Sequence, residues 1–141
     1  MENELATIPN DSVMATNNSM GASFCSFDTT TAEGKKKVFR ATSKADCTIK
    51  EFVNKPIKVV DVFARPVHLT DEETGEVRDG VTVVFFDTEG TSYAATSAGI
   101  YNATKALLDA FGHPSTWDGP ITIIPKEQKV AKGNMLTFDI I

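Results

Sequence analysis

The fold is decided by residues 81–112, which read VTVVFFDTEGTSYAATSAGIYNATKALLDAFG. Val81–Phe86 and Thr91–Thr96 are rich in β-branched and aromatic residues, which favour strands. Between them, Asp87–Gly90 is typical of a tight hairpin with glycine in the left-handed conformation. This stretch therefore predicts two neighbouring antiparallel strands.

A helix is predicted directly after the second of these strands. Ser97 is a residue type that caps helix N-termini, and Gly112 followed by Pro114 is a typical stop. Between these two signals, apolar or small residues recur at helical spacing: Ile100, Ala103, Thr104, Leu107, Leu108 and Phe111.

Strands are also predicted on both sides of this central stretch. Lys58–Leu69 is long enough for one bent strand, and its apolar alternation changes phase near Val60, as a β-bulge would produce. Thr70–Asp79 is a turn region, and Ile121–Ile124 and Met135–Ile141 indicate two further strands. The order is strand, strand, strand, helix, strand, strand. It is the order of the OB-fold, a five-stranded Greek-key barrel, and other small mixed folds share it.

We therefore expect a mostly β protein with one or two helices, built as an OB-fold barrel over residues 24–141. Residues 1–23 are rich in Asn, Ser, Thr and Met without a sustained period, and they predict a flexible arm. A short helix is expected to begin near residue 30 or 31. Val38 and Phe39 are expected to face inward from it, with its lysines outside.

The composition is that of an ordinary globular domain. The chain has 141 residues, of which 41% are hydrophobic and 23% charged. No run approaches the ~18 consecutive apolar residues of a membrane span. The N-terminus is acidic and lacks the apolar segment of a secretory signal, so a cytoplasmic protein is expected.

Sequence signatures of catalysis and of metal binding are weak. Cys25, Cys47, His68 and His113 are too widely separated for a zinc knuckle, and a disulfide is not expected in a reducing compartment. Gly34-Lys35 lacks the leading glycine and the hydroxyl residue of a phosphate-binding loop. We therefore expect no enzyme, no metal and no cofactor. A hydrolase that uses Cys25 as its nucleophile remains a minor alternative.

Charge is distributed unevenly along the chain. The net charge is −5, yet residues 35–65 contain nine basic residues and three acidic ones. Five acidic residues fall between Asp71 and Asp79. This asymmetry is compatible with phosphate binding on one side of the protein, and equally with a mixed solvated surface.

Aromatic and basic residues alternate on the predicted strands, a combination that single-strand binders use to stack bases and neutralise phosphates. Phe63 and Arg65 share one strand face, and the hairpin register pairs Phe85 with Tyr93. Other phenylalanines, such as Phe111, are expected in the core. The candidate nucleic-acid-binding residues are Lys35, Lys36, Lys37, Arg40, Lys58, Phe63, Arg65, His68, Arg78, Tyr93, Lys126, Lys129 and Lys132. An OB barrel would gather six of them, on strand ends and loops, around one groove: Lys58, His68, Arg78, Lys126, Lys129 and Lys132.

Four segments carry a resemblance to a known family: SFDTTTAEGK at 26–35, NKPIKV at 54–59, ETGE at 73–76, and the run from Asp87 to Tyr93. They resemble OB-fold single-stranded DNA-binding proteins of phages and conjugative mobile elements of Gram-positive bacteria. The resemblance spans residues 24–141. It implies a non-enzymatic, largely sequence-independent protein that binds single-stranded DNA during replication or conjugative transfer.

Two further expectations concern partners. Residues 1–23 are expected to dock onto a neighbouring subunit and to promote a homo-oligomer, because they are long, sparsely charged and contain methionine. The alternative function is an OB-fold adaptor that holds another protein of a replication or conjugation complex, which the net negative charge favours.

Overall fold

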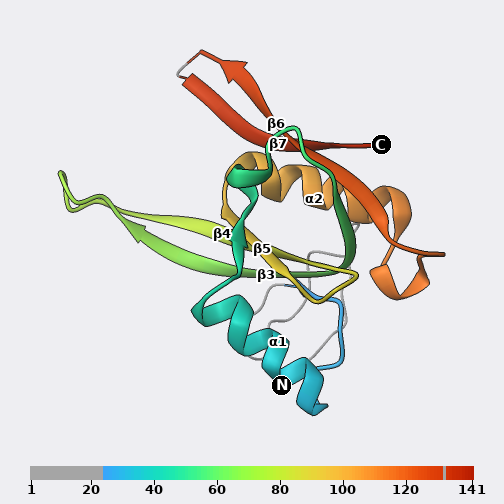
Figure 1. The fold of residues 1–141 in the computed structure, drawn as a ribbon. Helices are drawn as coiled ribbons and strands as arrows, with labels where there is room; N and C mark the ends of the chain where they lie inside the picture. Colours follow the sequence, from blue (N-terminus) through green and yellow to red (C-terminus); the bar gives the residue numbers. More distant parts are fainter. Residues whose placement is uncertain (1–23, 132) are drawn as a thin grey trace.

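A computed structural model describes residues 24–131 and 133–141, apart from the side chains of Leu69 and Arg78. Seven strands form one curled sheet around helix α2, and helix α1 lies against its other face (Figure 1). The elements are β1 (Phe24–Cys25), α1 (Ala32–Ser43), β2 (Cys47–Thr48), the 3-10 helix η2 (Ile49–Phe52), β3 (Ile57–Thr70), β4 (Val77–Asp87), β5 (Ser92–Thr96), α2 (Ala98–Phe111), the 3-10 helix η3 (Pro114–Thr116), β6 (Ile121–Val130) and β7 (Gly133–Ile140).

The expected mostly β architecture with two helices is confirmed, and β3, β4, β5, α2, β6 and β7 follow one another in the predicted order. The expected five-stranded closed barrel is not confirmed. The sheet has seven strands in the order β2-β5-β4-β3-β6-β7, with β1 paired to β3. Within the described chain no ladder joins β5 to β7, because β5 pairs instead with the short parallel strand β2. The sheet is therefore curled but open.

The predicted β-bulge is present in β3. The register against β4 shifts between Val59 and Asp61, and this irregularity allows the long strand to bend. The first residues of β3 pair with β6, whereas the rest pairs with β4. Two hairpins, β3–β4 and β6–β7, consequently extend beyond the body of the molecule (Figure 1).

Helix α2 begins and ends where the sequence predicts. The Ser97 hydroxyl accepts a hydrogen bond from the amide of Ile100 at 3.3 Å, and Gly112 ends the helix with φ of 82°. Leu108 and the other inward residues join the core between α2 and the sheet. Phe111 was expected in the core but is 49% exposed, at the C-terminal residue of α2.

Helix α1 covers the opposite face of the sheet. Thr31 caps it by accepting a hydrogen bond from the amide of Gly34 at 3.0 Å. Gly34 itself touches the preceding loop, so that a Cβ there would overlap the carbonyl oxygen of Asp28. Val38 and Ala41 continue the same stripe and pack on the second core cluster.

Phe39 does not face inward as expected. It is 69% exposed. Successive residues of an α-helix are about 100° apart, so the side chain that follows Val38 leaves the stripe formed by Gly34, Val38 and Ala41. The expectation for Val38 is confirmed, since it packs against the core.

Candidate nucleic-acid interface

The exposed side of α1 brings three cations and one aromatic ring together. Lys35 and Phe39 are one helical turn apart, as are Lys36 and Arg40, so the four side chains occupy two adjacent columns. They line a hollow of about 380 Å³. Within the described chain none of these three cations forms an ion pair. We call Lys35, Lys36, Phe39 and Arg40 the basic helix surface.

Lys37 belongs to the inward side of the same helix. Its Nζ lies 2.8 Å from Oδ2 of Asp61, with the two side chains 29% and 20% exposed. The same ammonium lies 5.1 Å from the ring centroid of Phe27 and 5.5 Å from that of Phe86. Lys37 was expected among the DNA contacts; its partners show that it instead holds α1 to β3.

The two aromatic residues expected to stack on bases are buried. Phe63 is 1% exposed, beneath α1, and Tyr93 is 7% exposed in the core next to α2. Tyr93 pairs with Phe85 as predicted, and its hydroxyl donates to Oδ2 of Asp87 at 2.7 Å. Burial, followed by this hydrogen bond, raises the pKa of Tyr93 well above its usual value. Neither ring is available to a base, and both are removed as stacking candidates.

The candidates on the β3–β4 hairpin differ in their surroundings. Arg65 lies beside the C-terminal end of α1, where its Nη2 donates to the carbonyl of Thr42 at 3.4 Å. His68 is exposed, and its Nδ1 is 2.8 Å from Oδ1 of Asp79, so an acidic group accompanies it. The side chain of Arg78 lies outside the described residues, as does the whole of Lys132.

The remaining candidates, Lys58, Lys126 and Lys129, are exposed on β3 and β6. Lys126 donates to Oδ1 of Asn54 at 3.2 Å. In Figure 1 the β6–β7 hairpin and α1 lie on opposite sides of the body, with the β3–β4 and β5 strands between them. The candidates on α1 therefore lie apart from those on the β6–β7 hairpin.

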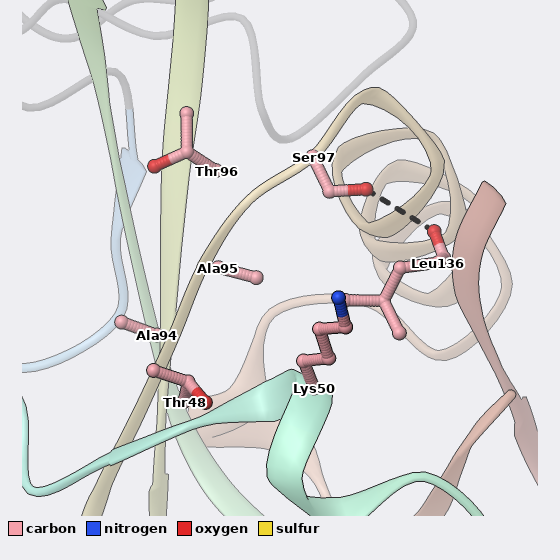
Figure 2. Close-up of a pocket in the computed structure, with 7 residues that line it drawn as sticks. All are labelled: Thr48, Lys50, Ala94, Ala95, Thr96, Ser97 and Leu136. Carbon is pink, nitrogen blue, oxygen red and sulfur yellow. Dashed lines mark hydrogen bonds between the residues drawn. The ribbon is translucent and has the colours of Figure 1, made fainter. Parts of the chain in front are cut away.

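A second hollow lies at the open edge of the sheet between β5 and β7 (Figure 2), where a closed barrel would have its last ladder. Its volume is about 440 Å³. The Ser97 hydroxyl crosses the opening by donating to the carbonyl of Leu136 at 3.1 Å, and Figure 2 shows the Lys50 ammonium directed toward Leu136. This seam hollow is lined by Thr48, Lys50, Ala94, Ala95, Thr96, Ser97 and Leu136.

The far end of the β3–β4 hairpin has the opposite charge. Hydrogen bonds order its turn: the Gly75 amide donates to the carbonyl of Asp71 at 2.7 Å, and the Glu73 amide donates to Oδ1 of Asp71 at 2.8 Å. All of its acidic side chains are exposed. We call the set Asp71, Glu72, Glu73 and Glu76 the acidic turn.

Cys25 and Trp117 are both half-buried and hydrogen-bonded to backbone carbonyls. Burial raises the pKa of Cys25 to about 11, so at neutral pH its thiol is protonated and a poor nucleophile. Trp117 is half-buried against the core, and its Nε1 donates to the carbonyl of Gly112 at 3.0 Å.

Within residues 24–131 and 133–141, no three His, Cys, Asp or Glu side chains meet in a way that could hold a metal ion.

An open curled sheet with an exposed cationic and aromatic helix surface defines a candidate single-strand-binding protein. The model of the Phi29-type phage single-stranded DNA-binding protein family matches residues 17–140, and the chain belongs to this family. The phage part of the expected resemblance is thus confirmed, whereas the match says nothing of conjugative elements. No curated protein and no solved structure matched the chain.

The described helices are too short or too polar to span a bilayer.

Sequence reasoning missed two residues of these surfaces. Phe39 was assigned to the core, although the spacing of Gly34, Val38 and Ala41 already defines an inward stripe that excludes it. Lys50 was counted in the basic region but not among the candidate contacts. No local signal places it at the seam hollow, because that hollow exists only where β2 and η2 pack beside β5.

Proposed function

We propose that this protein binds single-stranded DNA with little sequence preference during replication of a phage genome, in the cytoplasm and without covalent chemistry. The observation that carries the proposal is the basic helix surface, found in a chain of a phage single-stranded DNA-binding family. The order of the main strands around α2 supports an OB-type architecture, with its barrel left open between β5 and β7.

Phosphate neutralisation supplies most of the affinity in this account. α1 has four basic residues and one acidic residue, and within the described residues only Lys37 among the basic ones is committed to an ion pair. Lys35, Lys36 and Arg40, which have no ion-pair partner in residues 24–131 and 133–141, are open to the phosphates of a strand that crosses this helix. Arg65 adds a positive charge beside the end of α1, and Lys50 adds one at the separate seam hollow.

The size of the electrostatic effect can be estimated. For single strands the logarithm of the binding constant falls with the logarithm of salt concentration with a slope of about −0.7 per neutralised phosphate. Three contacts are therefore worth about 100-fold in affinity at about 0.1 M salt. Their loss makes the slope shallower by about 2.

The test is fluorescence anisotropy with a labelled oligo-dT and a duplex of equal length, measured over a series of salt concentrations. The wild-type protein is expected to prefer the single strand and to weaken as salt rises. The variant Lys35→Ala/Lys36→Ala/Arg40→Ala is expected to bind about 100-fold more weakly at about 0.1 M salt. The proposal would be contradicted if the wild-type protein failed to bind oligo-dT at low salt, or if its affinity for oligo-dT were the same at all salt concentrations.

A matched control separates the location of the site from the function. Lys105→Ala/Lys126→Ala/Lys129→Ala removes the same charge from α2 and from the β6–β7 hairpin. We expect this control to weaken binding much less than the α1 variant. A larger loss of affinity in the control than in the α1 variant would show that the phosphates contact the control lysines instead of α1. It would not contradict the proposal that the protein binds single strands.

A protein-interaction adaptor is the second candidate function, and the exposed acidic turn favours it. A partner with a basic surface would be attracted there by the same electrostatics that repel DNA. The anisotropy measurement distinguishes the two functions, because an adaptor gives no signal with oligo-dT at low salt.

We also propose that residues 1–23 promote a homo-oligomer on DNA. The proposal rests on their composition, and these residues lie outside the part of the chain that the structure describes. The family match begins only at residue 17, so most of this segment is an addition to the matched region. Deletion of residues 1–23 is expected to reduce the size of the DNA-bound complex, measured by light scattering. An unchanged size would contradict an oligomeric role.

A further inference from the structure

Phe39 is the most exposed aromatic side chain among the large hydrophobic residues of the described chain, at 69%. A single exposed phenylalanine is unremarkable by itself. Phe39, however, shares a hollow with Lys35, Lys36 and Arg40, whereas the other strongly exposed phenylalanine, Phe111, follows Asp109 near the end of α2. The two residues are alike in type and exposure, and they differ in the charge around them.

The arrangement of the four side chains suits a nucleotide better than a purely apolar ligand. Lys35 precedes Phe39 by one turn, and Lys36 and Arg40 lie in the adjacent column, so the ring and the three cations line one hollow. A nucleobase offers a flat face to the ring, and its phosphates offer negative charge to the lysines and the arginine. Stacking on an aromatic ring accepts every base, which matches binding with little sequence preference.

We propose that Phe39 is a base-stacking residue, on which one base of the strand lies while Lys35, Lys36 and Arg40 contact the phosphates on either side of it. The inference rests on the proposed function and specifies the site. It also gives a role to an exposed, large apolar side chain. Val38 and Ala41, and not Phe39, form the apolar contact of α1 with the sheet.

The test compares two strands and two variants. One strand is oligo-dT, and the other has the same number of phosphates but abasic sugars. Phe39→Ala is expected to bind oligo-dT about 5- to 150-fold more weakly than wild type and to bind the abasic strand equally well. Phe111→Ala, the matched control, is expected to bind both strands as wild type does. Melting temperatures of both variants equal to that of the wild type would show that folding is unchanged.

A second readout reports on the ring directly. In a Trp117→Phe background, Phe39→Trp provides one fluorophore at the site, and Phe111→Trp provides one at the control position. Oligo-dT is expected to quench the first strongly and the second hardly at all, while Phe39→Trp retains wild-type affinity.

The outcomes separate the inference from the function. Wild-type affinity of Phe39→Ala for oligo-dT, or equal losses on oligo-dT and on the abasic strand, would overturn the stacking role while leaving single-strand binding in place. A change in oligomer size without a change in DNA affinity would assign Phe39 to a contact between copies and would also overturn it. Failure of the wild-type protein to bind oligo-dT would overturn the proposed function itself.

Discussion

Helix α1 and the far end of the β3–β4 hairpin are both exposed, and they carry opposite charge. On α1, three cations without ion-pair partners in the described chain share a hollow with an exposed ring. On the hairpin, the acidic turn is exposed, and the nearby His68 is paired with Asp79. The net charge of −5 conceals this separation. Because a polyanion responds to the local field, it is attracted to one region and repelled by the other.

The two regions also differ in how they are held. α1 is fixed to the sheet by the apolar packing of Val38 and Ala41 and by the Lys37–Asp61 ion pair, and the close contact of Gly34 holds its first turn against the preceding loop. In the part of the chain that the structure describes, the acidic turn is held by local hydrogen bonds at the end of a long hairpin. A rigid support preserves the spacing of the cations on α1, which matters for a surface that must meet successive nucleotides.

The largest predicted effect on stability concerns the attachment of α1. Gly34→Ala places a methyl group against the carbonyl of Asp28, where rigid backbone cannot move aside cheaply. We expect a loss of about 2–3 kcal/mol and a melting temperature lower by about 6–10 °C. Trypsin is expected to cleave faster at the lysines of the loosened helix. Gly119→Ala, which meets nothing within 4 Å, is the control and is expected to melt as wild type does.

The next prediction contrasts two adjacent lysines of α1. Lys37→Gln removes the ion pair with Asp61 and is expected to lower the free energy of unfolding by about 1 kcal/mol, with little change in the salt dependence of DNA binding. Lys36→Gln is expected to leave stability unchanged and to make the salt slope shallower by about 0.7. Chemical denaturation and anisotropy measure the two quantities. A shallower salt slope for Lys37→Gln, with an unchanged slope for Lys36→Gln, would show that Lys37 and not Lys36 contacts the DNA.

A pH effect is predicted where the chain leaves α1. Hydrogen bonds from the backbone and the side chain of Ser92, to which Arg40 adds a weaker attraction, lower the pKa of Asp46 below its ordinary 3.8. The folded state therefore prefers the carboxylate form, and its stabilising contribution is complete above about pH 4 and is lost as the pH falls through the lowered pKa. Asp46→Asn is expected to melt below wild type at pH 6 and to approach it in strong acid. A constant difference at all pH values would contradict this linkage.

The smallest predicted effect concerns the acidic turn. Replacement of Asp71, Glu72, Glu73 and Glu76 by their amides removes negative charge far from α1 and is expected to tighten binding of oligo-dT by less than about 3-fold at low salt. A gain far beyond this value would show that the strand passes close to the turn. A loss of binding would contradict the contrast between the two regions.

Much of the fold was predictable from local signals. The caps at Thr31 and Ser97, the hairpin that pairs Phe85 with Tyr93 and the bulge near Val60 all follow from residue types and spacing, and the structure confirms them. The open edge was not predictable. β2 has only two residues, and its parallel pairing with β5 depends on where the chain returns after α1.

The candidate site was predicted less well than the fold. Alternation along a strand shows which residues share a face but not which face a helix will cover. Phe63 was therefore assigned to the surface, although α1 buries it. Charge alone identifies the lysines of α1, whereas Lys37 differs from its neighbours through partners that are distant in sequence, chiefly Asp61 and the ring of Phe86.

The most direct test of the account is a map of amide chemical-shift changes when oligo-dT is added to ¹⁵N-labelled protein. The account predicts the largest changes in α1, around Phe39, and almost none in the acidic turn. Large changes confined to the β3–β4 and β6–β7 hairpins, with α1 unaffected, would contradict it.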